Sequence, residues 1–512
     1  MVDQGYDIAD YYAINPIFGT IEDMDELLSE AKKRDITVLM DLVVNHCSNE
    51  HEWFQEAMRD PFGKYGQYFY IKEGKDGKAP NNWRAMFGGS VWEPVPGYEN
   101  LFYYHTFAKE QPDLNWENPG LREEIYKMVN WWLDKGVGGF RIDAISNIKK
   151  DLTWQDYPAD GPDGMASVMN VIEHAKGIGE FLTELRERCF TPHNAFTVGE
   201  VSDFSPESIK SYVGENGYFS TMFDLEQFYM VARGPHWIDW EHFSYANWKK
   251  KVFESQLYMQ QFAYPALALE NHDQPRCASR CIPEQDYGYE SVSALGSAYF
   301  FLYGLPFIFQ GEEIGMRNIV MKDVDEYDDI STKNDYYYAR ERGCSHEEAM
   351  EICYNYARDN GRTPMQWTGD EKAGFTAGDP WLKVNPLCSG INVADQEERE
   401  VSVLKYFRKM ISLRNGKEYR SALVYGKTKP LFVEIEPLFA YDRVSEESGQ
   451  CVRIIVNFSD RTVTLPRDAA EGEILLSNFG TPALEDGQVV LKPYQAFIIG
   501  RWRSVHEGLS FE

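Results

Sequence analysis

The sequence has no excess of positive charge, no long apolar run and no cysteine framework. Its 81 acidic residues outnumber 51 basic ones, giving a formal net charge of −30. That balance disfavours nucleic acid and anionic membranes as partners, because both require basic patches. The longest apolar stretch, residues 294–309, contains two glycines and a proline and is too short to span a bilayer.

The start of the chain lacks the basic and apolar segments of a secretion signal, and the eight cysteines are scattered over 512 residues. Cys277 and Cys281 lie four residues apart, but no second pair of ligands nearby completes a zinc site. We therefore expect a cytoplasmic protein with reduced thiols, no metal and no cofactor.

What the sequence does contain is an alternation of apolar, strand-like runs with amphipathic helical stretches. A capping-box pattern at Thr20–Asp23 predicts a helix that closes near three basic residues at 32–34. The run Ile36–Val44 is almost continuously apolar, as in strands buried on both faces of a parallel sheet. Six such strands are expected, at residues 36–44, 138–145, 195–201, 220–224, 264–270 and 307–310.

Polar residues lie at or just beyond the C-terminal ends of four of these strands: His46, Asp143, Glu200 and Asp273. In a doubly wound sheet the catalytic residues lie at one switch point, whereas in a barrel they lie at the ends of many strands. We therefore predict an α/β fold of the (β/α)8 TIM-barrel type. Only six strands are found, so the first two, with the helix between them, are expected upstream of Met1.

Two further segments interrupt or follow the barrel pattern. Residues 47–118 have no clean periodicity and many aromatic residues, which predicts a small inserted domain. Residues 316–383 form a charged excursion, and from about residue 430 short alternating runs predict a β-sandwich, with strands at 431–434, 452–456, 462–465, 474–476, 489–491 and 496–499. The predicted domains are a barrel at 1–46 and 119–429, an inserted domain at 47–118 and a β-sandwich at 430–512.

The run Gly139–Asp143 (GFRID) is the most informative motif. Arg141 and Asp143 are two residues apart, so on a strand their side chains point to the same face. A cation beside a carboxylate keeps it ionised, as a nucleophile requires. A structural ion pair is the alternative interpretation of these residues alone, but Glu200 and Asp273 add two more strand-end carboxylates.

Together these motifs resemble glycoside hydrolase family 13, the α-amylase superfamily, and within it the oligo-1,6-glucosidase and α-glucosidase group. The matching strings are DLVVNH (41–46), GFRID (139–143), VGEV (198–201), ENHDQPR (270–276), QPDLNW (111–116) and RDNGRTPMQW (358–367). The resemblance implies that Asp143 is the nucleophile and Glu200 the general acid and base. It implies that Asp273 binds sugar hydroxyls and stabilises the transition state.

The same resemblance implies a glucose pocket that is closed at its far end, and therefore an exo-acting enzyme. Tyr6 would be its stacking platform, and Phe107 is a candidate for its entrance. The other residues expected to bind substrate are Asp3, His46, Arg141, His272 and Arg362. Arg358 lies four residues before Arg362 and could be confused with it.

The expected function is a retaining α-glucosidase acting on short oligosaccharides. Ala144 is small, and in similar enzymes small residues after the nucleophile accompany α-1,4 cleavage, so maltose-type bonds are favoured over isomaltose-type bonds. Trehalose-6-phosphate hydrolase and a non-catalytic, glycosidase-like scaffold subunit are the alternatives. The family's metal-binding loop would lie upstream of Met1, and the sequence does not indicate an oligomeric state.

Overall fold

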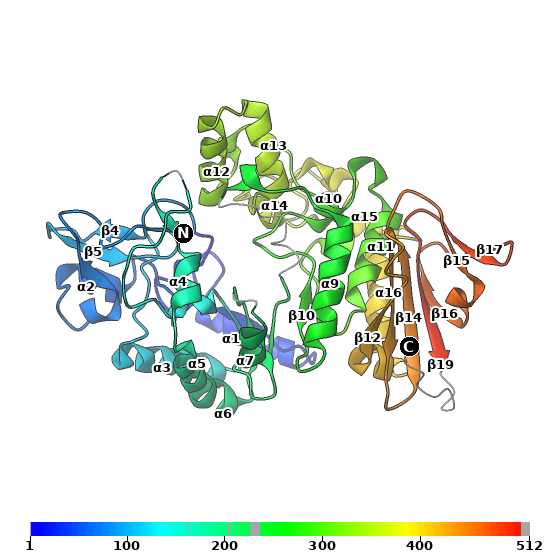
Figure 1. Ribbon diagram of the computed structural model, residues 1–512, viewed down its shortest axis with the longest axis horizontal. Helices are drawn as coiled ribbons and strands as arrows, with labels where there is room; N and C mark the ends of the chain where they lie inside the picture. The colour runs from blue at the N-terminus through cyan, green and yellow to red at the C-terminus, as the bar shows by residue number, and fades with distance from the viewer. Residues whose placement is uncertain (1, 162, 203–204, 226–235, 503–512) are drawn as a thin grey trace. The chain divides into compact units, whose positions relative to one another are not determined.

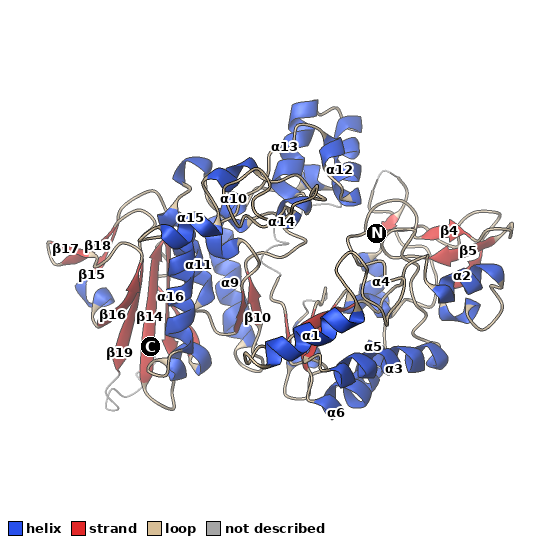
Figure 2. Cartoon of the chain, turned by 180° about the vertical axis from the view of Figure 1, so that it is seen from behind, coloured by secondary structure: helices blue, strands red, loops and turns tan. Residues whose placement is uncertain are grey.

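The computed structural model describes residues 2–161, 163–202, 205–225 and 236–502. Its internal contacts divide the chain into two compact units, Met1–Phe223 and Asp224–Glu512, called here the first and second unit (Figures 1 and 2). The last residues of the predicted β-sandwich, 503–512, lie outside the described residues.

The main sheet of the first unit contains four parallel strands in the order β1-β6-β8-β9. These strands are β1 (Leu39–Leu42), β6 (Gly139–Ile142), β8 (Phe196–Gly199) and β9 (Thr221–Met222). Each lies inside one of the predicted strands. Gly139 is required at the start of β6, because its φ is +150° and a Cβ would lie 1.8 Å from the carbonyl oxygen of Phe196.

The helix predicted from the capping box is present in the first unit. The Thr20 side chain accepts a hydrogen bond from the N–H of Asp23, and Asp23 caps in return, so α1 (Ile21–Lys32) has a complete capping box. The helix α3 (Pro119–Lys135) begins at a proline after the N-cap Asn118 and ends at Gly136 in the left-handed region. The remaining helices are α2 (Glu52–Arg59), α4 (Met169–His174), α5 (Ile178–Leu185), α6 (Thr191–His193) and α7 (Pro206–Val213). In both figures α3, α5 and α6 lie side by side.

A small antiparallel sheet follows β1 in the chain, in the order β2-β5-β4. It consists of β2 (Ile71–Glu73), β4 (Trp92–Pro94) and β5 (Leu101–Tyr104). A second pair, β3 (Trp83–Arg84) with β7 (Ala166–Ser167), joins this region to the loop after β6. Arg84 strengthens that junction through an ion pair of 2.7 Å with Asp160 and another of 2.7 Å with Asp163.

In the second unit, β10 (Ala266–Ala268) and β11 (Leu305–Phe307) form a parallel pair. The strand β10 lies inside the predicted strand 264–270, whereas β11 begins two residues before the predicted strand 307–310 and overlaps it only at Phe307. The helices of this unit are α9 (Tyr245–Met259), α10 (Cys277–Cys281), α11 (Tyr289–Phe300), α12 (Ile330–Glu341), α13 (His346–Tyr356), α14 (Asp359–Arg362), α15 (Val393–Glu398) and α16 (Val403–Asn415).

The chain ends in two antiparallel sheets, ordered β12-β13-β14-β19-β16 and β15-β18-β17. Their strands are β12 (Lys427–Leu431), β13 (Leu438–Val444), β14 (Gln450–Asn457), β15 (Val463–Pro466), β16 (Glu473–Ser477), β17 (Ala483–Glu485), β18 (Gln488–Leu491) and β19 (Ala496–Trp502). Apolar side chains of both sheets share one core, which includes Ile455, Phe497 and Leu491. The helices α11 and α16 pack on the larger sheet, as Figures 1 and 2 show.

Three details of this module differ from the sequence prediction, and one of them is the unpredicted strand β17, whose three residues are all exposed. A strand was expected at 431–434, but β12 ends at Leu431 because Phe432 adopts a left-handed backbone with φ of 49°. The strand β13 was not predicted, since all seven of its residues are buried and it lacks the alternation of a half-exposed strand.

Candidate active site

In the first unit, one arginine joins three carboxylates. Arg141 lies on β6, and its Nη1 atom is 2.7 Å from Asp143 and 2.8 Å from Asp41. Its Nη2 atom is 2.9 Å from Glu200. Asp143 directly follows β6 and Glu200 directly follows β8, so neighbouring parallel strands deliver both carboxylates to one edge of the sheet.

The electrostatics of Asp143 differ from the sequence-based expectation. Arg141 was expected to keep the pKa of Asp143 low. Instead, burial of the carboxyl group raises the pKa of Asp143 well above its usual range, and the negative charges of Glu200 and Asp41 raise it further. Arg141 opposes these effects but does not outweigh them.

Glu200 is anchored through one of its two carboxyl oxygens. Oε2 accepts the Arg141 contact and also a hydrogen bond of 3.1 Å from the backbone N–H of Ala144. Ala144 can aim its N–H in this way because its backbone is left-handed, with φ of 44° and ψ of 34°. A non-glycine residue in this region stores strain, which is common at functional sites.

The predicted sugar-binding residues of the first unit lie together beside this cluster. The Tyr6 hydroxyl donates to Asp41 at 2.6 Å, and the Arg141 guanidinium lies 5.6 Å from the centre of the Tyr6 ring. His46 is buried, with Nε2 2.8 Å from the Tyr6 carbonyl oxygen and its ring 5.2 Å from that of Phe107. Burial lowers the pKa of His46, although nearby carboxylates oppose this effect.

Gln111 was quoted within a motif but not recognised as a site residue. Its side chain is fully buried, and its Nε2 atom lies 3.2 Å from an oxygen of Asp3, 3.2 Å from the Tyr6 carbonyl and 3.2 Å from His46 Nε2. Gln111 therefore joins three predicted site residues from two other segments of the chain. Its place in the motif QPDLNW (111–116) was the available signal.

In the second unit, Asp273 is surrounded by cations. Its Oδ1 atom is 2.7 Å from Arg362 and 3.1 Å from Arg358, and its Oδ2 atom is 3.2 Å from His272. Burial opposes ionisation of Asp273, but the charge and hydrogen bond of His272 and the charges of both arginines hold its pKa well below the usual range. Both arginines that could be confused in the sequence therefore contact the same carboxylate, and Arg358 also pairs with the buried Asp329 at 2.5 Å.

The helix turn that carries these two arginines packs closely against another backbone segment. Gly361 lies between them on α14, and a Cβ there would be 2.8 Å from the carbonyl oxygen of Gln274 and 2.9 Å from that of Asn271. Beneath this turn, Arg276 is fully buried and pairs with Glu270 at 2.9 Å. Its Nη2 atom also donates to the Gly361 carbonyl at 3.2 Å.

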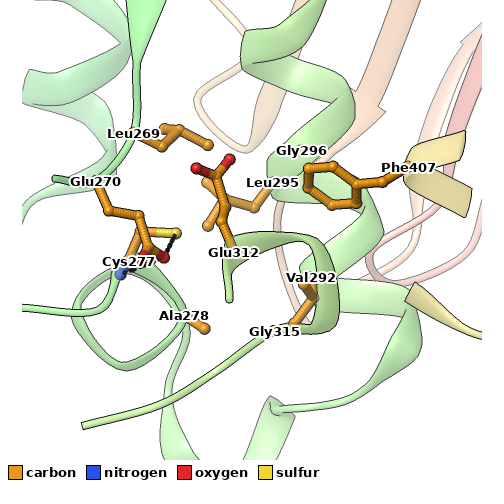
Figure 3. Close-up of a pocket in the computed structure, with 10 residues that line it drawn as sticks. All are labelled: Leu269, Glu270, Cys277, Ala278, Val292, Leu295, Gly296, Glu312, Gly315 and Phe407. Carbon is orange, nitrogen blue, oxygen red and sulfur yellow. Dashed lines mark hydrogen bonds between the residues drawn. The ribbon is translucent and has the colours of Figure 1, made fainter. Parts of the chain in front are cut away.

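A small cavity lies behind Glu270, between α10, α11 and α16 (Figure 3). Glu270 accepts hydrogen bonds from the backbone N–H and the thiol of Cys277, while the carboxyl group of Glu312 points into the cavity beside Leu269 and Leu295. Burial and the charge of Glu270 raise the pKa of Glu312 well above its usual range. The cavity walls are mainly apolar, so we assign it no ligand.

Asp143 and Glu200 belong to the first unit and Asp273 to the second. The convergence of the three carboxylates stays a prediction. Within the described ranges, no group of three or more His, Cys, Asp or Glu side chains is arranged to hold a metal ion. Nor does any helix in that part of the chain have the length and apolar character needed to cross a membrane.

Carboxylates at the ends of parallel strands, with aromatic and hydrogen-bonding side chains beside them, are typical of enzymes that hydrolyse glycosidic bonds. Residues 1–426 match the family model "Alpha amylase, catalytic domain", and residues 436–498 match "Domain of unknown function (DUF3459)". The chain therefore belongs to the α-amylase family and is a glycoside hydrolase, as the motifs predicted.

Similar proteins extend over almost the whole chain. "Probable oligo-1,6-glucosidase 3" of Bacillus subtilis (strain 168) is 37% identical over 505 residues, which is 97% of this chain and 89% of the relative. "Trehalose-6-phosphate hydrolase" of Escherichia coli (strain K12) is 34% identical over 499 residues, covering 97% of this chain and 88% of the relative.

Among solved structures, the isomaltulose synthase PalI of Klebsiella sp. LX3 has a TM-score of 0.90 at 30% identity, covering 97% of this chain and 89% of that one. The trehalose-6-phosphate hydrolase TreA of Bacillus licheniformis has a TM-score of 0.87 at 34% identity, covering 98% and 90%. These similarities confirm the predicted fold class, a TIM-type α/β barrel with a C-terminal antiparallel β-domain.

Proposed function

We propose that this protein is a retaining, exo-acting α-glucosidase that releases terminal glucose from short α-linked oligosaccharides. The observation that carries the proposal is the bridge from Arg141 to Asp143 and Glu200, which holds two carboxylates at the ends of adjacent strands. A retaining glycosidase requires two carboxyl groups about 5–5.5 Å apart. Relatives named oligo-1,6-glucosidase support a small α-glucoside as the substrate.

In the first step, an oxygen of Asp143 bonds to the anomeric carbon while the glycosidic carbon–oxygen bond breaks. Glu200 gives its proton to the departing oxygen. Because Arg141 and the Ala144 N–H both occupy Oε2 of Glu200, we place that proton on Oε1, facing the leaving group. Arg141 orients the Asp143 oxygen for attack through the contact of 2.7 Å.

In the second step, Glu200 takes a proton from water, the water oxygen bonds to the anomeric carbon, and the bond to Asp143 breaks. Glucose leaves with its original α configuration. We assign Asp273 to the sugar hydroxyls and to the positive charge that develops on the ring. Its low pKa keeps it ionised for that role.

We assign the sugar-binding roles to the residues that the motifs indicated. Tyr6 provides the stacking surface, and Phe107, beside His46, lines the entrance. The hydroxyl groups would be bound by Asp3, His46, His272 and Arg362. The buried cluster of Asp3, Gln111 and His46 supports a pocket that closes around a single glucose, and hence an exo mode of action.

Charge balance favours an unphosphorylated sugar over trehalose-6-phosphate. Arg141 faces three carboxylates, and Arg358 and Arg362 share Asp273 and Asp329. Each of these cations is therefore already neutralised by an acid. A phosphate dianion would add negative charge to groups that are already acidic. The retained carboxylates likewise argue against a non-catalytic scaffold subunit.

For the linkage, we favour α-1,4 bonds with α-1,6 bonds also accepted. The small side chain of Ala144, next to the nucleophile, leaves room for the differently angled aglycone of maltose. A cytoplasmic location belongs to the same proposal. It is supported by deeply buried thiols such as Cys47 and Cys277, whose pKa values are raised by burial.

The test is glucose release from maltose, isomaltose, sucrose and trehalose-6-phosphate, measured side by side. We expect maltose and isomaltose to be cleaved, with α-glucose as the first anomer seen by proton NMR. Asp143→Asn should abolish turnover and leave the melting curve unchanged. The choice of substrate would be wrong if trehalose-6-phosphate were cleaved fastest. The retaining mechanism would be wrong if β-glucose appeared first, and the nucleophile would be wrong if Asp143→Asn turned over at a rate close to wild type.

A further inference from the structure

The helix α2 begins at a buried histidine that the proposed reaction does not use. His51 is the N-cap residue, and its Nδ1 atom accepts a hydrogen bond of 3.1 Å from the backbone N–H of Trp53. Only 6% of His51 is exposed. Because Nδ1 acts as an acceptor, it keeps its lone pair, and the proton of the neutral ring lies on Nε2. The start of this helix therefore requires a neutral imidazole.

Two aromatic rings beside His51 connect it to the candidate site. The centre of its ring lies 5.3 Å from that of Tyr11 and 4.5 Å from that of Trp53. The hydroxyl of the buried Tyr11 donates a hydrogen bond of 3.0 Å to the backbone carbonyl of His46. The backbone N–H of His51 also donates to the carbonyl of Ser48 at 3.0 Å. A shift of the imidazole would therefore act on the His46 segment through one side chain and one short turn.

Protonation of His51 would remove the cap. An imidazolium ion has two N–H donors and no acceptor, so Nδ1 would face the Trp53 N–H donor to donor. The N-terminus of a helix also carries a partial positive charge, which disfavours a cation there. Burial lowers the pKa of His51 to about 4, although the charge of Asp10 opposes this shift.

We propose that His51 is an acid-sensitive switch: its neutral ring holds the start of α2 and the contact of Tyr11 with His46, and its protonation releases both. Within the described residues, the ionisable groups that face the imidazole are Asp10 and Tyr11 of the N-terminal loop. Glu50 and Glu52, on either side of it in the chain, are exposed. The switch goes beyond the proposed function, and only its activity measurement rests on that function.

This arrangement makes the folded state less stable in acid. The ordinary pKa of histidine is 6.5, so between that value and about 4 the unfolded chain binds a proton at His51 that the folded chain does not. The stability that neutral His51 contributes is complete above this range and is lost as the pH falls through it. From about pH 7 to about pH 5, this residue should lower the folding equilibrium constant by roughly tenfold to thirtyfold.

The first experiment is urea unfolding of the full chain at about pH 7 and about pH 5, with His51→Asn and His51→Ala. At about pH 7, His51→Asn should unfold near the wild-type midpoint and His51→Ala at a lower one, because only alanine lacks a capping acceptor. Neither side chain titrates, so both variants should lose less stability than wild type on acidification, by roughly the same tenfold to thirtyfold.

His193→Asn is the matched control for the loss of a histidine. The Cys189 carbonyl and Asp134 raise the pKa of His193, so its contribution to stability grows as the pH falls. This variant should therefore lose at least as much stability as wild type on acidification, which is opposite in sign to the effect at His51.

The second experiment measures the pKa directly, by carbon-13 NMR titration of the histidine side chains in the wild-type chain. The His51 signal is the one missing from His51→Asn, and we expect its midpoint at about pH 5 or below. At about pH 4 half of the folded chain would carry the proton, so KM of the wild type for maltose should be about twofold above that of His51→Asn.

An NMR midpoint near the ordinary histidine value, or equal losses of stability in wild type and His51→Asn on acidification, would overturn the switch. If His51→Asn does not fold, His51→Gln identifies the signal and the wild-type titration decides alone. Failure of the proposed function looks different, because the chain would release no glucose from any of the four sugars while the unfolding and NMR results on His51 would stand.

Discussion

A buried lysine contacts polar residues next to the candidate site, and its removal tests how much this buried ion pair stabilises the protein. The Nζ atom of Lys150 lies 2.6 Å from Asp113 and 3.0 Å from the side-chain oxygen of Asn45, and it also donates to the Asn147 carbonyl. The side chains of Lys150 and Asp113 are 1% and 0% exposed. Asp113 accepts further hydrogen bonds from the backbone N–H and the hydroxyl of Thr106.

Lys150→Met keeps the length of the side chain and removes its charge, which leaves Asp113 buried without a cation. Breaking a buried ion pair in this way costs about 3–5 kcal/mol. The adjacent Lys149 is the matched control, because it pairs with Glu117 in a more exposed position, at 13% and 32% exposure. A partly exposed pair costs less to break than a fully buried one, so Lys149→Met should lose clearly less stability than Lys150→Met.

The assay is urea unfolding of both variants, followed by tryptophan fluorescence. With an m-value of about 3 kcal/mol/M, Lys150→Met should lower the unfolding midpoint by about 1 M or more. Since Asn45 donates to Nδ1 of His46 at 3.2 Å, KM for maltose should rise as well. Equal urea midpoints for the two lysine variants would refute the reasoning, because the loss of unfolding free energy would then not depend on how deeply the ion pair is buried.

Three further predictions follow from other buried contacts. Burial and a neighbouring carboxylate raise the pKa of Glu312, and a raised folded-state pKa contributes stability that is lost as pH rises through it. Glu312→Gln should therefore lose less stability than wild type as the pH rises above the ordinary range of a glutamate, measured in thermal melts; parallel curves would contradict this. Gly361→Ala would place a Cβ 2.8 Å and 2.9 Å from two carbonyl oxygens of the turn that carries Asp273. We therefore expect kcat/KM to fall by about a hundredfold while the fold is retained. Wild-type kinetics would show that the turn can adjust to the methyl group. Lys249 donates to the carbonyls of residues 433, 435, 436 and 438, so Lys249→Met should lower the free energy of unfolding by about 1.5–3 kcal/mol in thermal melts. Lys250→Met on the exposed face is the control and should have no measurable effect. Similar losses in both variants would show that these four carbonyl contacts do not stabilise the fold.

Local features of the fold could be predicted because they depend on neighbours in the chain. The capping box at Thr20 and the apolar run before His46 depend on residues within a few positions, and the helix and the strand both lie where expected. The expected burial of that strand on both faces was wrong, since only Leu42 of β1 is buried. The strand β13 could not be predicted, because burial on both faces removes the alternation that marks a strand. The turn at Phe432 was also missed, because a left-handed backbone at a bulky residue is imposed by its surroundings.

The candidate site was predictable in its residues and not in its electrostatics. The position of Asp143 two residues after Arg141 was enough to expect their ion pair. The raised pKa of Asp143 was not predictable, since it depends on burial and on Asp41, which is 100 positions from Arg141 in the chain. Gln111 was missed as a site residue for the same reason, because its partner Asp3 lies 108 positions away.

From its order of residues alone, this polypeptide indicated most of its strands, the start of its first helix, its family and the candidate site residues. All of these follow from short-range periodicity and from motifs a few residues long. The tertiary structure decided which carboxylates share Arg141, which oxygen of Glu200 is occupied, and that two arginines hold Asp273. Pairwise distances and burial set these properties, and both exist only once distant segments have packed together.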